Sequence, residues 1–294
     1  MEFLKNYKFN LSSDDIKNRI EKIQAVSKKY YQTEVLKNIF GLIDLTTLNS
    51  TDTIGKVEKM VEKVNKFTTV FSDMPNVAAI CVYPSLVETV KNNLIDKNLG
   101  IASVAAGFPS SQTFLEIKTL ESKLAVQKGA TEVDIVISIG TFLSGDYQTV
   151  FNEIKAVKKA IGNAHLKVIL ESGILENPQK IWDASIIAME AGADFIKTST
   201  GKMQPAATLE AVYVMCLAIN EFHKDSNKKI GLKPAGGIST GNQAIAYYAV
   251  VNEILGSDWL KPEFFRIGAS SLANNLLSEI AALDSGSEVE VSYF

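Results

Sequence analysis

The sequence predicts a single α/β domain, a (β/α)8 barrel of the TIM type with an additional N-terminal helix. Eight short apolar runs recur along the chain, and a stretch of helical period follows each run. Most of the runs are continuous rather than alternating, which is typical of parallel strands covered on both faces. Eight such units in one uninterrupted series favour a closed barrel over an open doubly wound sheet. The runs span residues 39–45, 77–83, 100–106, 133–139, 166–170, 193–198, 230–233 and 264–268.

Capping residues mark the starts of several predicted helices. Asp146, Thr208 and Thr240 precede segments of helical period, and Asn177 stands before Pro178 at the start of another. Such side chains accept hydrogen bonds from the free N–H groups of a first helical turn, and Pro fits the first helical position. We therefore expect helices to begin at these four positions.

A further helix is expected to begin at Ser111 and to end at Gly129. Its apolar residues recur at helical spacing, which predicts one stripe of the kind that faces a core. The members of this stripe are Phe114, Ile117, Leu120, Leu124 and Ala125.

Residues 39–283 contain the eight units, so we assign them to one barrel domain. Residues 1–38 form an N-terminal helical extension, in which Ser12 and Asp15 have the spacing of a capping box. We expect this helix to lie across the lower mouth of the barrel. Residues 284–294 are expected to form a flexible C-terminal tail, and no linker marks a second domain.

Composition and charge argue against several classes of protein. The 294 residues are 46% hydrophobic and 21% charged, with a formal net charge of −3. Interspersed charges of both signs give no support for binding to nucleic acid or to an anionic membrane. No window reaches the about 18 apolar residues that a membrane span needs, and no secretory signal is recognisable. We expect a cytoplasmic protein.

The chain has few residues for metal or disulfide chemistry. Its two cysteines, Cys81 and Cys216, cannot build a disulfide framework, and its two histidines lie far apart in the sequence. We therefore expect no bound metal and no cofactor. Arg19 and Arg266 are the only arginines, so any bound phosphate must be held mainly by lysine and backbone N–H groups.

Two lysines carry the strongest sign of chemistry. Lys197 lies within the sixth apolar run and Lys233 holds the matching place in the seventh, so adjacent strands are expected to aim two ammonium groups into one cavity. Desolvation and mutual repulsion both lower the pKa of a buried lysine. A neutral amine attacks carbonyl groups, so the pair predicts a Schiff base. The competing interpretation is two lysines that are each neutralised by a separate buried carboxylate.

Buried acids are expected near these lysines. Asp134 stands among β-branched residues of the fourth run and needs a partner or a proton. It is either a structural counter-ion to one of the lysines or a proton carrier between lysine, water and substrate, and the sequence leaves both open. Lys167 and Glu171 lie four apart on the fifth strand, and we interpret them, like Arg266, as structural charge pairs.

Small residues follow the last two strands. Gly236 and Gly237 come after the seventh run, and residues 268–271 lead from the eighth run into a helical segment. Glycines let the backbone approach an anion, and a helix N-terminus adds free N–H groups. Barrels commonly bind phosphate at these two loops. The sequence therefore predicts a phosphate site here, within reach of Lys202.

These motifs resemble those of the deoxyribose-phosphate aldolase family, metal-independent aldolases that form a Schiff base on a (β/α)8 barrel. The resemblance extends from about Leu42 to Leu272 and includes seven collinear motifs. The motifs are residues 42–48, 81–84, 104–109, 132–137, 195–202, 233–237 and 265–271.

The resemblance implies a role for each matching residue. Lys197 matches the lysine that forms the Schiff base, Lys233 the second lysine that lowers its pKa, and Asp134 the carboxylate that transfers protons. Tyr293, followed by Phe294, is the nearest counterpart of a terminal tyrosine that assists proton transfer in some members. The remaining matches are to residues that line the substrate pocket or bind the phosphate: Asp44, Thr46, Cys81, Thr200, Gly201, Lys202, Gly236, Gly237, Ser270 and Ser271.

The activity that the resemblance implies is the reversible cleavage of 2-deoxy-D-ribose 5-phosphate to D-glyceraldehyde 3-phosphate and acetaldehyde. The expected partner is this small phosphorylated sugar, and a homodimer is the candidate assembly. Two alternatives remain open on sequence alone. One is another Schiff-base barrel aldolase of the transaldolase-like or keto-acid type, and the other is a non-catalytic barrel that binds phosphate.

Overall fold

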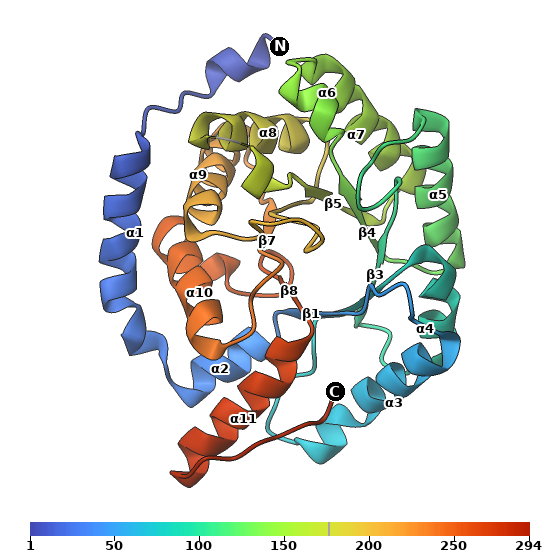
Figure 1. Cartoon of the computed structure of the whole chain (residues 1–294), viewed down its shortest axis with the longest axis vertical. Helices are drawn as coiled ribbons and strands as arrows, with labels where there is room; N and C mark the ends of the chain where they lie inside the picture. The colour runs from blue at the N-terminus through green and yellow to red at the C-terminus, as the bar shows by residue number, and fades with distance from the viewer. Residues whose placement is uncertain (176) are drawn as a thin grey trace.

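The computed structural model describes residues 1–175 and 177–294, and it shows eight parallel strands surrounded by helices (Figure 1). Hydrogen-bonded neighbours follow the order β7-β6-β5-β4-β3-β2-β1-β8. Isolated parallel bridges from Leu232 to Phe265 and from Ala235 to Gly268 join β7 to the β8 side and close the barrel. The strands are β1 (Ile43–Thr46), β2 (Ala79–Val82), β3 (Gly100–Val104), β4 (Glu132–Val136), β5 (His165–Ile169), β6 (Phe195–Lys197), β7 (Gly231–Lys233) and β8 (Ile267–Ala269).

Eleven α-helices are present in the described part of the chain. They are α1 (Ser13–Ser27), α2 (Thr33–Phe40), α3 (Ile54–Val70), α4 (Val87–Asn93), α5 (Leu115–Lys128), α6 (Ile139–Leu143), α7 (Tyr147–Ile161), α8 (Pro178–Glu190), α9 (Leu209–Ser226), α10 (Gly241–Leu255) and α11 (Ser271–Ser285). Short 3-10 turns are η1 (Phe3–Asn6), η2 (Lys28–Tyr30), η3 (Pro84–Leu86), η4 (Ser172–Ile174) and η5 (Ser257–Trp259).

The predicted barrel is confirmed, because each of the eight apolar runs contains or overlaps one strand. The first apolar run, residues 39–45, begins before the strand that it predicts. Ile39 and Phe40 are buried residues that end α2, and the strand begins only at Ile43. A continuous apolar run cannot by itself separate a buried strand from the buried end of a helix.

The predicted caps are confirmed at all four positions. The side chains of Asp146, Asn177 and Thr208 accept hydrogen bonds from the third residue of the helix that follows. Thr240 forms a full capping box with Gln243. These local signals position the helices between the strands because they satisfy the free N–H groups of each first turn.

The prediction for the helix after β3 is wrong in its start and in its buried face. Phe114 rather than Ser111 occupies the N-cap of α5, although Gly129 ends the helix in a left-handed conformation as expected. Most of the predicted stripe is exposed, with Phe114 at 78% and Leu120 at 51%, and only Ala125 of it is buried. Polar residues of α5 face inward instead, since Lys118 Nζ donates to Ser138 Oγ at 2.6 Å and to a carboxylate of α7.

The N-terminal extension contains the predicted capping box, formed by Ser12 and Asp15. Its position differs from the prediction, because α1 does not cross the lower mouth of the barrel. It packs against α9 and α10 on the outside of the helical ring (Figure 1). Ile16, Ile20 and Ile23 are the buried residues of α1, so its apolar stripe is covered by this ring.

The C-terminal tail packs against the barrel over its last residues, although we predicted a flexible segment at 284–294. Phe294 stacks on Phe67 of α3 with ring centroids 5.6 Å apart, and its backbone N–H donates to Asn274 of α11. Tyr293 also contacts the Phe67 ring. Figure 1 shows this segment returning from the end of α11 towards α3. Burial of aromatic side chains supplies the attraction.

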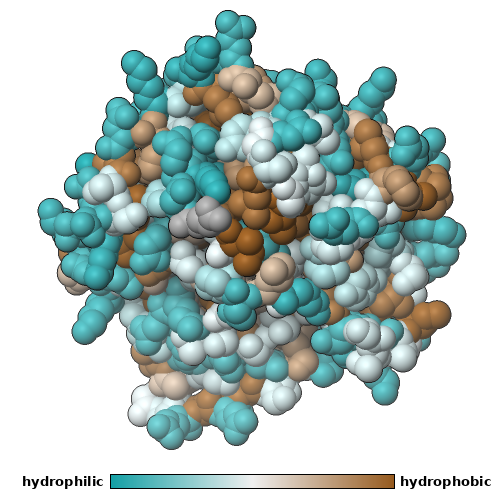
Figure 2. Space-filling view, turned by 45° about the horizontal axis from the view of Figure 1, so that its top comes forward, coloured by the Kyte–Doolittle hydropathy of each residue, from teal (hydrophilic) through white to brown (hydrophobic). Residues whose placement is uncertain are grey.

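The outer surface is mainly polar on the face drawn in Figure 2, where hydrophilic residues make up most of the outline. A cluster of hydrophobic residues lies near the centre of this face. Among residues 1–175 and 177–294, no helix is long and apolar enough to cross a membrane.

Packing of α1 on the helical ring yields a test of stability. Ile20→Ala should lower the free energy of unfolding by about 2–5 kcal/mol, because it removes buried methyl groups and leaves a cavity. Val26→Ala on the same helix, where the side chain is 51% exposed, should change it by no more than about 0.5 kcal/mol. Urea denaturation measures both. Equal effects of the two substitutions would contradict the packing of α1 against α9 and α10.

Candidate functional site

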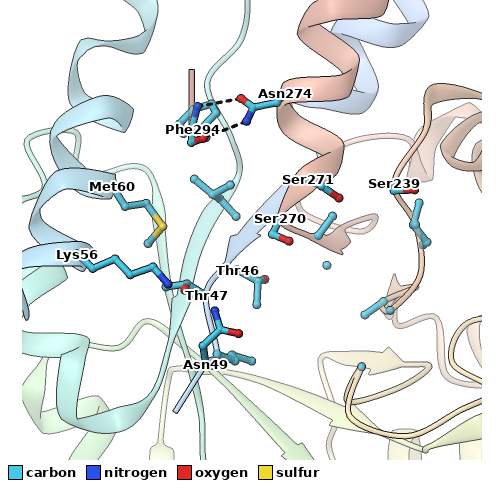
Figure 3. A pocket seen from close by; sticks show the side chains of 18 of the residues that line it. Thr46, Thr47, Asn49, Lys56, Met60, Ser239, Ser270, Ser271, Asn274 and Phe294 are labelled. Atoms are coloured by element: carbon cyan, nitrogen blue, oxygen red, sulfur yellow. Dashed lines mark hydrogen bonds between the residues drawn. The ribbon is translucent and has the colours of Figure 1, made fainter. Parts of the chain in front are cut away.

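A cavity of about 1090 Å³ opens at the carboxyl ends of the strands (Figure 3). Its walls come from the loops after β1, β6, β7 and β8, from α3 and from the start of α11. This is the end of a (β/α)8 barrel at which reactions take place. Nine of the predicted site residues line it: Thr46, Lys197, Thr200, Gly201, Lys202, Gly236, Gly237, Ser270 and Ser271.

Four predicted site residues lie beneath the cavity rather than on its wall. Asp44, Cys81, Asp134 and Lys233 are each fully buried. Burial raises the pKa of the Cys81 thiol, so this cysteine is a neutral packing residue below the pocket. The resemblance implies that Asp44 and Cys81 line the substrate pocket, but in the structure both lie behind its wall and have no surface in the cavity.

One carboxylate joins the two predicted lysines. Nζ of Lys197 and Nζ of Lys233 each donate to Oδ2 of Asp134 at 2.8 Å. The parallel register of β6 and β7 aligns Lys197 directly with Lys233, so both side chains extend to the same side of the sheet. Gly268 leaves room for this arrangement, because a Cβ there would lie 3.1 Å from Cε of Lys233.

Below the cavity, further buried charged residues form ion pairs that are linked to this contact through Lys233. Asp44 pairs with Lys233 and with Arg266. Its Oδ2 lies 2.5 Å from Nζ of Lys233, and its Oδ1 lies 2.6 Å from Nη1 of Arg266. Arg266 also reaches Glu132 at 2.9 Å, and Lys167 pairs with the other oxygen of Glu132. Together these residues form a buried charge network, whose members are Asp44, Glu132, Asp134, Lys167, Lys197, Lys233 and Arg266.

The buried charge network contains one cation more than it has carboxylates. Three carboxylates face three lysines and one arginine. An uncompensated charge is costly away from water, and a titratable group avoids this cost by changing its protonation state. Arg266 keeps its charge in proteins. One of the three lysines is therefore expected to be the group that loses its proton most easily.

The electrostatic surroundings assign that role to Lys197. Burial lowers the pKa of Lys197, and the positive charge of Lys233 lowers it further. The negative charge of Asp134 raises this pKa, but the net effect is a lowered pKa. Burial also acts to lower the pKa of Lys233, but the charges of Asp134 and Asp44 outweigh it and raise that pKa. Lys167 behaves in the same way, since Glu132 and the two aspartates raise its pKa against the effect of burial.

The lowering of the pKa that burial and repulsion predict for a buried lysine is thus found for Lys197, whereas the pKa of Lys233 is raised. Within the described residues, two carboxylates pair with Lys233, whereas Lys197 pairs with Asp134 alone. Lys233 thus stays a cation and destabilises the charged form of its neighbour. Although burial opposes ionisation, Lys197 and Lys233 hold the pKa of Asp134 well below its ordinary range.

The predicted pair of Lys167 and Glu171 is also wrong. Lys167 pairs with Glu132, and the carboxylate of Glu171 accepts hydrogen bonds from the hydroxyl of Thr200 at 2.6 Å and from its backbone N–H. Glu171 lies just beyond the end of β5 in a left-handed conformation, which removes it from the regular side-chain alternation of a strand. It positions the loop after β6 instead. Arg266 is confirmed as a structural charge partner.

The loops predicted to bind phosphate lie together in the cavity wall. Gly236 adopts a φ of +88°, and a Cβ there would lie 2.7 Å from Cβ of Ala206 and 3.2 Å from Cα of Gly201. Only glycine fits this turn without strain. Ser270 precedes α11 and Ser271 is its first residue, so free N–H groups of this helix begin at the cavity (Figure 3).

Two other predicted residues occupy different positions at the cavity. Lys202 lines the cavity, and its Nζ donates to the carbonyl of Leu48 at 2.5 Å. Tyr293 is absent from the lining, and its hydroxyl donates to the carbonyl of Lys63 at 2.8 Å. Phe294 lines the cavity instead, next to Asn274 (Figure 3). The structure does not bring the Tyr293 hydroxyl to the lysine pair.

A family model described as DeoC/LacD family aldolase matches residues 39–272. The chain belongs to this family. A curated relative, the deoxyribose-phosphate aldolase of Homo sapiens, is 41% identical over 285 residues, covering 93% of this chain and 90% of the relative. A curated relative from Caenorhabditis elegans is 44% identical over 271 residues, and the match covers 91% of this chain and 89% of the relative. The solved structure of QR15, an aldolase, has a TM-score of 0.67 at 29% identity, covering 83% of this chain and 96% of that one.

One wall of the cavity in this DeoC/LacD family aldolase was not predicted from the sequence. Lys56, Lys59, Met60 and Lys63 of α3 line it, as does Asn274 of α11. The signal was present in the spacing, because residues three, four and seven apart share one face of a helix. Within the described residues, no group of three or more His, Cys, Asp or Glu side chains is arranged to hold a metal ion.

The buried charge network of the aldolase yields a second test of stability. Arg266→Met should lower the free energy of unfolding by about 3–5 kcal/mol, because it removes the positive charge that Asp44 and Glu132 share and leaves the two buried carboxylates only with their lysine partners. Lys37→Met removes a lysine from a pair with an exposed carboxylate, Asp73, and should leave stability nearly unchanged. Chemical denaturation of both variants measures the difference. An Arg266→Met protein as stable as the parent would mean that Arg266 does not compensate these carboxylates.

Proposed function

We propose that this aldolase cleaves 2-deoxy-D-ribose 5-phosphate reversibly to D-glyceraldehyde 3-phosphate and acetaldehyde, through a Schiff base on Lys197. The family supplies the reaction class, and the curated human relative is named for this substrate. The observation that carries the proposal is the position of Lys197. Lys197 lines the cavity, and its Nζ shares the carboxylate of Asp134 with Lys233, which keeps its positive charge.

The reaction begins with the neutral amine of Lys197. The nitrogen attacks C1 of the open-chain sugar, and loss of water gives a protonated imine. The imine draws electrons from the C2–C3 bond, which breaks while the C3 hydroxyl loses its proton to a base. D-glyceraldehyde 3-phosphate leaves, and an enamine remains on Lys197. Protonation of the enamine at C2 and addition of water then release acetaldehyde and restore the amine.

Asp134 is the proton carrier that we propose for these steps. Its carboxylate lies 2.8 Å from the reacting nitrogen, which is within the range for direct proton exchange. It is buried, so the exchange takes place away from bulk water. Lys233 contacts the same oxygen and keeps Asp134 ionised between transfers.

The phosphate is proposed to lie at the loops after β7 and β8. Gly236 and Gly237 allow close approach of the backbone, and Ser270 and Ser271 stand at the start of α11. Lys202 supplies a positive charge on the adjoining wall. Binding at this end of the substrate fixes the reacting carbons near Lys197, which lowers the entropy cost of the reaction.

The Schiff base yields a direct test of the nucleophile. Sodium borohydride with acetaldehyde should attach a two-carbon group to Lys197, identified by peptide mass spectrometry, and Lys197→Leu should abolish labelling and lower kcat by at least about 10⁴-fold. Lys118→Leu, which removes a buried lysine outside the cavity, should leave the label on Lys197. A label on Lys233 would reverse the two roles, and a Lys197→Leu protein that turns over substrate would contradict the proposal.

We further propose a homodimer in which α5 packs against α5 of a second copy. Five large apolar side chains of this segment are exposed, and such a contiguous patch is typical of an interface. The members are Phe114, Leu115, Ile117, Leu120 and Leu124. Glu116 and Lys123 are also exposed and lie on either side of Leu120. A two-fold axis near Leu120 therefore sets Glu116 of each copy against Lys123 of the other.

The dimer is tested by charge substitutions on α5. Leu120→Glu should give a monomer in sedimentation velocity, whereas Ile95→Glu, at another exposed apolar residue, should not. Glu116→Lys and Lys123→Glu should each weaken the dimer, and the double variant should restore it because the pairs are exchanged. A monomeric parent protein, or a dimer that none of these substitutions weakens, would contradict the proposed interface.

A cytoplasmic location and a role in deoxyribonucleotide catabolism complete the proposal. Both cysteines are free and buried, as is usual where thiols are kept reduced. The proposed substrate is a phosphorylated deoxysugar, the same sugar phosphate that deoxyribonucleotides contain.

A further inference from the structure

One wall of the cavity is positively charged and has no role in the proposed reaction. Lys56, Lys59 and Lys63 line the cavity from one face of α3. Figure 3 shows this helix, with Lys56 and Met60, on the opposite side of the cavity from Ser270, Ser271 and Ser239. The lysine row therefore lies across the cavity from the proposed phosphate loops.

The charge of this wall is not balanced within the cavity. In the described residues no aspartate or glutamate lines the cavity, although the chain as a whole has a net charge of −3. Lys56 pairs with Asp52, which is itself held by Thr47. Lys59 and Lys63 are exposed, and within the described part of the chain neither has an ion-pair partner.

The size of the cavity leaves space beside this wall. Its volume of about 1090 Å³ exceeds the ~300–1,000 Å³ of typical pockets for drug-sized ligands. A phosphorylated five-carbon sugar bound between Lys197 and the loops after β7 and β8 is smaller than such ligands. The α3 side of the cavity therefore stays open to water and ions while the sugar reacts.

A concave surface with charge of one sign attracts ions of the opposite sign and raises their rate of association by about 10- to 10³-fold. We propose that Lys59 and Lys63 form a second anion-binding position, which captures the phosphate of the incoming sugar before it passes to the loops after β7 and β8. This inference rests on the proposed function and adds an entry step to it. Its ligand is a phosphate monoester dianion.

The test is the salt dependence of kcat/KM for 2-deoxy-D-ribose 5-phosphate. At an ionic strength of about 10 mM, the double variant Lys59→Gln/Lys63→Gln should show a kcat/KM about tenfold below that of the parent. At about 1 M, where the Debye length is roughly 3 Å, the two values should converge. The value of kcat should be the same for both proteins, because the two lysines do not contact the reacting sugar.

Two controls separate capture from other effects. The kcat/KM for 2-deoxy-D-ribose, which lacks the phosphate, should be equal in parent and variant. Lys17→Gln/Lys22→Gln, which removes two exposed lysines of α1, should behave as the parent at every salt concentration. A defect of the Lys59→Gln/Lys63→Gln protein that persists at high salt, that lowers kcat, or that extends to the unphosphorylated sugar would overturn the inference. So would parent-like values at low salt, whereas a parent protein without turnover of the phosphorylated sugar contradicts the proposed function itself.

Discussion

The site depends on an imbalance of charge in the barrel interior. The buried charge network holds three carboxylates and four basic groups away from water, so one basic group is left without full compensation. Arg266, Lys167 and Lys233 are held as cations by the acids that contact them. In the part of the chain that the structure describes, Lys197 pairs with one carboxylate, which it shares with Lys233, and it alone of the three lysines lines the cavity. Position and electrostatics thus select the same nitrogen as the nucleophile.

The barrel produces this selection through strand register rather than through a local motif. The alignment of Lys197 with Lys233 places two ammonium groups side by side, and Asp134 on β4 reaches both. The difference between the two lysines comes from β1, because Asp44 contacts Lys233 but not Lys197. Closing the sheet between β7 and β8 brings β1 close to β7, with β8 between them. An open sheet would not hold Asp44 against Lys233 in this way.

The sequence predicted those features that depend on neighbouring residues. Continuous apolar runs located the strands, and Asp146, Asn177, Thr208 and Thr240 located helix starts, because both signals are local. Features that depend on distant partners were not predictable. An apolar stripe shows that α1 buries one face, but it does not show that this face meets α9 and α10. In α5 the predicted stripe is exposed, whereas Lys118 on the inward face is buried and donates to Ser138 and Glu153 on other elements. The raised pKa of Lys233 depends on Asp44, which the sequence places far away.

Site-specific titration of the two amines tests the central claim most directly. With ¹⁵N-labelled lysine, the Nζ resonances of Lys197 and Lys233 can be assigned by substitution and followed against pH. We expect Lys197 to lose its proton below the ordinary lysine value of about 10.4, and Lys233 to remain protonated across the range in which the protein is folded. Equal titration of the two lysines, or deprotonation of Lys233 before Lys197, would contradict the account.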